Sequence, residues 1–249
     1  MFSECNCKCH MYNSDRTTEN SSNNSNNSAK STSISHWEVC VMGDDLMRLL
    51  ISYQLFGKDL SHQPNPRYSF CLRGQKIRDA YNTILDKQTT FKSRFKYILL
   101  NLGAIDILLG RDVIDIEADF ARLIKAIKLI GLIPIITTLP PIRLEENHPN
   151  FKEIYQTLLI FNNFLITMFG SNHLVVNLCD IFIKANHVDP DKYYYNVPHS
   201  INVHGKVFKI YPWNHCGREK IIETIDETIN FEIPKDAARP IVHREMIGI

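Results

Sequence analysis

Short glycine-containing motifs recur along this sequence, and two of them carry carboxylates. Gly43-Asp44-Asp45 is the first, Gly74 follows it, and Gly103-Ala104-Ile105-Asp106 is the third. Asp44 and Asp106 have the chemistry of a general acid-base pair, but aspartates after glycine turns also cap helices and bind loop amides. We favour the capping role.

A histidine lies in a fourth motif, which runs from Lys209 to Gly217 and reads Lys-Ile-Tyr-Pro-Trp-Asn-His-Cys-Gly. His215 is a candidate general base, and Asn214 has the side chain of a helix N-cap. A base needs a nucleophile to activate, and Asp45 has no hydroxyl to deprotonate. Hydrolysis would therefore require an acyl or phosphoryl intermediate on Asp45, or a movement of His215.

The elements that would position these motifs alternate between short apolar runs and longer helical periods. Strands are predicted at 38–42, 68–72, 97–102, 132–137 and 174–177, and helices at 46–53, 75–85, 115–130, 151–169 and 214–229. This alternation predicts a doubly wound, flavodoxin-like α/β fold, a three-layer αβα sandwich around a five-stranded parallel sheet. The carboxyl ends of the strands, and with them the glycine motifs, then meet at one edge.

The chain of 249 residues divides by composition into one domain and two tails. Residues 1–36 are rich in Asn and Ser and are expected to be disordered, 37–231 form the domain, and 232–249 form a carboxyl-terminal tail. Cys5, Cys7 and Cys9 alternate with other residues, which is not the spacing of common zinc sites. We expect no metal and no cofactor.

The net charge and the cysteine content indicate which partners and which cellular compartment suit the protein. The formal net charge of +1 gives no global attraction to nucleic acid or membranes, so any polyanion site must come from local clustering. Residues 1–10 do not resemble a secretory signal, and the apolar runs are too short to span a membrane. Seven cysteines, an odd number, favour reduced thiols. These features predict a cytoplasmic protein.

The motifs, in this order and over 37–231, resemble the SGNH (GDSL) hydrolase superfamily. In that family a Gly-Asp-Ser turn supplies the nucleophile, a glycine and a Gly-x-Asn-Asp loop stabilise the oxyanion, and a late Asp-x-x-His supplies the base. The resemblance puts Asp45 at the serine, Ile105 at the asparagine, Lys209 at the acid and Pro212 at the histidine. It therefore implies a hydrolase fold without catalytic residues, that is, a pseudoenzyme.

Further motifs narrow the resemblance. The runs 102–107 and 133–141, the pair Gly110-Arg111 and the ending Trp213-Asn214-x-x-Gly217-Arg218 are most similar to the OSK-domain family of insect germ-plasm proteins. This resemblance implies an intracellular, non-catalytic domain that binds RNA and helps to assemble ribonucleoprotein granules.

Basic residues cluster near the predicted strand ends, where they would bind the phosphates of single-stranded RNA, such as a messenger RNA. Trp213, Tyr211 and Phe208 would stack on its bases. The other interpretation, which we accept for Lys125 and Lys128, is that such cations only solvate helix faces. The predicted RNA-binding residues are Arg48, Arg73, Lys76, Arg78, Lys206, Lys209, Trp213, Arg218 and Lys220.

Two other functions stay open. One is an ester hydrolase with an atypical site at Asp45 and His215. The other is a protein-interaction scaffold, suggested by the Asn/Ser-rich tail and by Tyr193, Tyr194 and Tyr195, which follow Pro190. For those tyrosines we favour the simpler interpretation, a packed loop.

Overall fold

The computed structural model describes residues 39–51, 69–145, 148–184, 187–188 and 190–232. The predicted tails at 1–36 and 233–249 lie outside these ranges. Glu232, which we assigned to the carboxyl-terminal tail, is instead the last residue of a helix.

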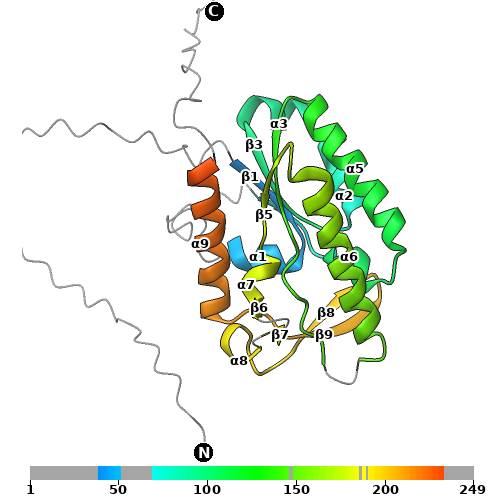
Figure 1. The fold of residues 1–249 in the computed structure, drawn as a ribbon. Helices are drawn as coiled ribbons and strands as arrows, with labels where there is room; N and C mark the ends of the chain where they lie inside the picture. Colours follow the sequence, from blue (N-terminus) through cyan, green and yellow to red (C-terminus); the bar gives the residue numbers. More distant parts are fainter. Residues whose placement is uncertain (1–38, 52–68, 146–147, 185–186, 189, 233–249) are drawn as a thin grey trace, which may run out of the picture. The chain divides into compact units, whose positions relative to one another are not determined.

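A five-stranded parallel sheet in the order β2-β1-β3-β4-β5 forms the centre of the fold, as the sequence predicted (Figure 1). This is the flavodoxin-like order, in which the direction of winding reverses between β1 and β3. Every predicted strand is present, with ends shifted by one residue or so. The strands are β1 (Val39–Gly43), β2 (Ser69–Cys71), β3 (Tyr97–Asn101), β4 (Ile133–Thr137) and β5 (Leu174–Val176).

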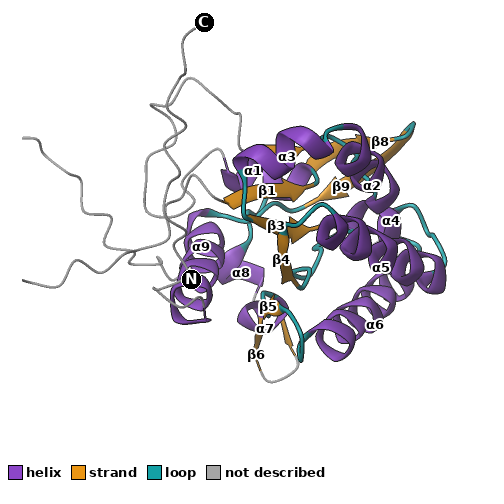
Figure 2. Cartoon of the chain, turned by 90° about the horizontal axis from the view of Figure 1, so that it is seen from above, coloured by secondary structure: helices purple, strands orange, loops and turns teal. Residues whose placement is uncertain are grey.

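Helices cover both faces of this sheet (Figure 2). Alternate strand residues such as Cys40 and Ile98 face one core, together with α2, α4, α5 and α6, whereas Val41 and Leu99 face a second core with α1, α7 and α9. The predicted three layers are therefore confirmed. The helices are α1 (Asp45–Ile51), α2 (Ile77–Asp86), α3 (Gln88–Arg94), α4 (Ala104–Leu108), α5 (Val113–Leu129), α6 (Phe151–Phe169), α7 (Cys179–Phe182), α8 (Pro190–Tyr193) and α9 (His215–Glu232).

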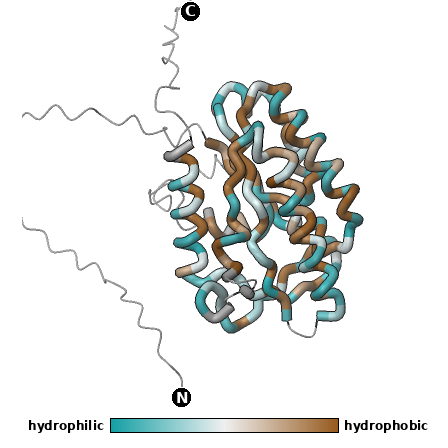
Figure 3. Tube along the Cα trace, in the orientation of Figure 1, coloured by the Kyte–Doolittle hydropathy of each residue, from teal (hydrophilic) through white to brown (hydrophobic). Residues whose placement is uncertain are grey.

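The central strands are apolar along their length because both of their faces are covered (Figure 3). All five residues of β1 and all five of β3 are buried. None of the described helices has the length and apolar character of a membrane-spanning segment.

Two antiparallel hairpins were not predicted. One is short, β6 (Ile183–Lys184) with β7 (His187–Val188), and the other pairs β8 (His199–Val203) with β9 (Lys206–Ile210). The β8–β9 turn holds His204 at φ 49° and Gly205 at φ 84°. Two successive positive φ values are typical of the tight turns that favour glycine, so His204-Gly205 between alternating apolar residues was a readable signal.

The carboxyl ends of β1, β2 and β3 are aligned. Gly43 lies opposite Cys71 of β2 and Asn101 of β3. The chain leaves β3 through Gly103, where φ is +121° and an added Cβ would lie 2.6 Å from Phe161. Since other residues rarely adopt such a φ and would also collide with this ring, glycine is required to start α4 here.

Candidate functional site

The turn after β1 and the turn after β2 are joined by a hydrogen bond. Asp45, the first residue of α1, accepts the backbone N–H of Gly74 on its Oδ2 at 2.7 Å. Asp45 is half-buried, and Gly74 has a positive φ of 64°. A carboxylate therefore occupies the place beside the Gly74 amide.

Asp44 is fully buried next to this turn. Its Oδ1 accepts the N–H of Leu46 at 2.9 Å, which confirms the predicted capping role in the first turn of α1. Burial raises the pKa of the Asp44 carboxyl to about 7. Among the described residues, no hydrogen-bond partner reaches its Oδ2.

Asp106, the other predicted capping residue, binds the start of α2. It accepts the N–H of Ile77 at 3.0 Å and the guanidinium of Arg111 at 2.5 Å, and Arg111 also binds Asp119 at 2.8 Å. Burial raises the pKa of Asp106, and the hydrogen bonds from Ile77 and Arg111 oppose that rise. Both aspartates therefore hold backbone amides, and Arg111 is a charge partner that sequence reasoning missed.

The other positions that the hydrolase resemblance assigned are distributed between the core and the surface. Ile105 is 1% exposed, and Pro212 is buried. Lys209 pairs with Glu145 at 3.2 Å, and the exposed His215 pairs with Glu219 one turn along α9 at 3.1 Å. Within the described ranges, no group of three or more His, Cys, Asp or Glu side chains could hold a metal ion.

Three of the predicted RNA-binding cations are exposed around the joined turns. Arg48 lies in the last turn of α1, and Arg73 and Arg78 flank the start of α2. None of them takes part in an ion pair with another described residue. Lys76 lies between Arg73 and Arg78 in the sequence and is half-buried. Its backbone N–H donates to the carboxylate of Asp79 at 3.1 Å.

The predicted interface needs correction at its aromatic side. Trp213 is 5% exposed and packs in the second core, with its ring 6.4 Å from that of Phe182, so it offers no surface to a base. Phe208 is 6% exposed. Arg218 is 9% exposed and donates to the hydroxyl of Tyr195 at 3.0 Å. We therefore remove Trp213 and Arg218 from the interface.

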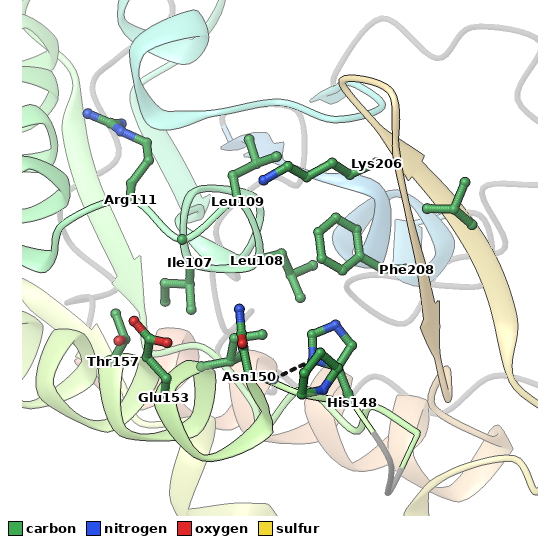
Figure 4. A pocket seen from close by; sticks show the side chains of 14 residues that line it. Ile107, Leu108, Leu109, Arg111, His148, Asn150, Glu153, Thr157, Lys206 and Phe208 are labelled. Atoms are coloured by element: carbon green, nitrogen blue, oxygen red, sulfur yellow. Dashed lines mark hydrogen bonds between the residues drawn. The ribbon is translucent and has the colours of Figure 1, made fainter.

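The last two cations lie elsewhere. Lys220 pairs with Glu223 within α9. Lys206 lines a groove of about 610 Å³ between the end of α4, the start of α6 and β9 (Figure 4). The described contacts thus join the segment of Arg48 to that of Arg73, Lys76 and Arg78 through the Asp45–Gly74 hydrogen bond. No hydrogen bond or ion pair between described residues joins Lys206 or Lys220 to these two segments.

Two tyrosines make cation–π contacts with arginines, which the sequence did not predict. The guanidinium of Arg143 lies 4.5 Å from the centre of the Tyr211 ring, and Arg218 lies 5.6 Å from that of Tyr195. Tyr194 is buried, and its hydroxyl donates to the carbonyl of Pro141 at 2.7 Å. The tyrosine run is therefore largely a packed loop, of which Tyr195 is the exposed member.

The surviving Asn214 and Gly217 have structural roles. Asn214 Oδ1 accepts the N–H of Gly217 at 3.0 Å, which confirms the predicted N-cap of α9. An added Cβ on Gly217 would lie 2.4 Å from the carbonyl oxygen of Tyr193.

The family model for the OSK domain matches residues 19–231. The chain belongs to the OSK-domain family. Two curated relatives, both named maternal effect protein oskar, are 26% identical over 192 residues in Drosophila melanogaster and 25% identical over 191 residues in Drosophila virilis. Each match covers 77% of this chain, which spans about 30% of the length of each relative.

Solved structures agree with this assignment. The OSK domain of Drosophila Oskar superimposes with a TM-score of 0.60 at 25% identity, covering 76% of this chain and 86% of that one. A GDSL-like lipase from Bacteroides thetaiotaomicron gives a TM-score of 0.60 at 12% identity, covering 78% and 88%. This OSK domain therefore has the SGNH-hydrolase fold, and the likeness to the lipase concerns the fold alone.

Proposed function

We propose that this chain is a non-catalytic SGNH-fold domain that binds single-stranded RNA at the carboxyl edge of its sheet. We further propose that it acts in the cytoplasm, in assembling germ-plasm ribonucleoprotein granules. The observation that carries RNA binding is the exposed cationic group formed by Arg48, Arg73 and Arg78 around the joined turns. Guanidinium groups bind phosphates with two parallel hydrogen bonds, which suits a nucleic-acid backbone.

The chemistry of the joined turns argues against ester hydrolysis. An oxyanion needs preorganised N–H donors, and the Gly74 N–H already binds the carboxylate of Asp45. A second negative charge would be repelled from the same place. The asparagine position holds a buried isoleucine, and loss of one oxyanion donor costs about 100- to 1,000-fold in rate.

The cellular role is taken from the relatives, whose name refers to a maternal effect. The cytoplasmic assignment is supported by Cys40, Cys71 and Cys179, which form no disulfide with another described residue, because reduced thiols are typical of reducing compartments.

Photo-crosslinking of the full chain to single-stranded RNA containing 4-thiouridine tests this function. We expect crosslinked peptides that include the start of α2. A crosslinking yield equal to that of an inert control protein would overturn RNA binding.

A protein-interaction scaffold is a second candidate, and the outer face of α6 favours it. Leu159, Ile160 and Ile166 are 38–52% exposed there. Exposed apolar side chains that form a contiguous patch are typical of protein-contact sites. Partner binding that resists nuclease and is lost in Ile160→Glu would support this candidate, and partner binding unchanged by that substitution would exclude the face.

A further inference from the structure

A groove lies between Ile107–Arg111, the start of α6 and the beginning of β9 (Figure 4). From its geometry we infer that this groove accepts one unstacked nucleobase of a bound single-stranded RNA, while Lys206 holds an adjoining phosphate. The inference rests on the proposed RNA binding and gives it a second, base-dependent contact.

The size of the groove suits one nucleotide. Its volume is about 610 Å³, and sites for small organic ligands are typically about 300–1,000 Å³. Apolar side chains form part of the lining, among them Ile107, Leu108 and Phe208.

An aromatic stack stands at one side of the groove. The ring of His148 lies over that of Phe208, with centroids 6.1 Å apart and planes inclined by 25°. The backbone N–H of Asn150 donates to Nδ1 of His148 at 3.3 Å, which holds the imidazole in place. Phe208 is buried and His148 is only half-buried, so His148 is the ring that a further planar group can reach. Unstacked RNA bases bind on such rings.

Polar groups at the N-cap and in the first turns of α6 complement the edge of a base. Asn150, Glu153 and Thr157 line the groove and offer an amide, a carboxylate and a hydroxyl (Figure 4). Nucleobase edges carry both donors and acceptors, which an amide can pair with in two places and a carboxylate can meet at an amino group. A bare anion would be repelled by Glu153, so this lining favours a base over an isolated phosphate.

The two cationic side chains of the groove, Arg111 and Lys206, are not equally free to bind a phosphate. Arg111 is held by Asp106 and Asp119, at 2.5 Å and 2.8 Å, and so acts as part of the wall. Lys206 is exposed on β9, and its side chain extends along the groove in Figure 4. One such lysine matches one phosphate next to the bound base.

The test measures binding of the full chain to two labelled oligomers of equal length, a mixed-sequence RNA and an abasic ribose-phosphate chain. We expect His148→Ala and Asn150→Ala each to weaken binding of the RNA by about fivefold or more and to leave binding of the abasic chain unchanged. Lys206→Ala should weaken binding of both oligomers and reduce the slope of log K against log salt by about 0.7.

Asn163→Ala is the matched control, since Asn163 is exposed further along α6 and does not line the groove. Thermal melts verify that each variant is folded. If the unaltered chain binds RNA and the His148 and Asn150 variants bind it equally well, the groove assignment is wrong and the arginine group remains. If the unaltered chain binds no RNA, both proposals fail.

Two further measurements distinguish an RNA base from other possible ligands of the groove. Titration with nucleoside monophosphates that saturates below about 1 mM and is abolished by Asn150→Ala would assign the groove to a free nucleotide and overturn the RNA assignment. Capture of a peptide, lost in His148→Ala while RNA affinity is unchanged, would overturn it in favour of a protein ligand.

Discussion

The carboxylate of Asp45 accepts the backbone N–H of Gly74 at 2.7 Å, so the first two turns at the carboxyl edge of the sheet are bonded directly to each other. The resemblance to SGNH hydrolases predicts a serine nucleophile at the position of Asp45 and an oxyanion-binding amide at Gly74. In this chain the carboxylate and the amide bind each other, and the pair holds α1 beside the start of α2, where Arg73 and Arg78 are exposed.

Removing this bond should loosen the edge. Asp45→Ala leaves the Gly74 N–H without its acceptor, and hydrogen bonds to charged groups contribute about 1.5–3 kcal/mol. Because the site is half-exposed, we expect the lower end of that range in urea unfolding. Asp45→Asn keeps an acceptor oxygen and should recover most of the loss; an equal loss in both variants would show that the bond contributes nothing.

Restoring a hydroxyl should not restore hydrolysis. Asp45→Ser supplies a nucleophile and frees the Gly74 amide, but the side chain of Ile105 has no hydrogen-bond donor and Pro212 provides no base. We expect hydrolysis of short acyl esters at the background rate for both the serine variant and the unaltered chain. Activity in the unaltered chain that disappears in Asp45→Ala would contradict the non-catalytic assignment.

Asp44 should make stability depend on pH. Its pKa is about 7 in the folded chain, against 3.8 for an ordinary aspartate, so the folded state holds the proton more tightly. The resulting stabilisation is complete below the unfolded pKa and is lost as pH rises through about 7. Asp44→Asn removes this titration, so its stability relative to that of the unaltered chain should rise between pH 5 and pH 8 by about 3 kcal/mol, that is, by about two pH units at 1.36 kcal/mol each. Urea unfolding at both pH values measures the difference, and a gap that does not grow with pH would refute it.

Trp213 should matter for folding and not for RNA. Its buried ring packs in the second core, and truncation of such a side chain to alanine costs about 3–5 kcal/mol. Trp213→Phe retains an aromatic ring there, so we expect a modest fall in melting temperature and RNA affinity equal to that of the unaltered chain. A clear loss of affinity in the folded phenylalanine variant would reinstate Trp213 as a contact.

The layers and strand order were predictable because buried parallel strands and amphipathic helices leave strong periodic signals. β1 and β3 are continuous apolar runs, and α5 places Ile116, Phe120 and Ile127 on one buried stripe. The capping roles of Asp44 and Asn214 followed from local chemistry alone.

The exposure of individual side chains was harder to predict. Trp213 and Lys209 are close together in sequence, but one lies in the core and the other on the surface, which depends on the unpredicted β8–β9 hairpin. The salt bridge from Arg111 to Asp119 joins α5 to the turn before it, a contact that residue types did not specify. Such contacts depend on tertiary packing, which leaves only a weak signal in a single sequence.

The central claim, that RNA binds at the joined turns, is tested most directly by a salt titration of RNA affinity for two charge-reversed variants. One variant carries Arg73→Glu and Arg78→Glu; the matched control carries Lys125→Glu and Lys128→Glu on the exposed face of α5. We predict at least about a tenfold loss of affinity and a salt slope reduced by about 0.7 per lost phosphate contact in the first variant, with a much smaller change in the control. Unchanged affinity in the arginine variant, or an equal loss in both, would contradict it.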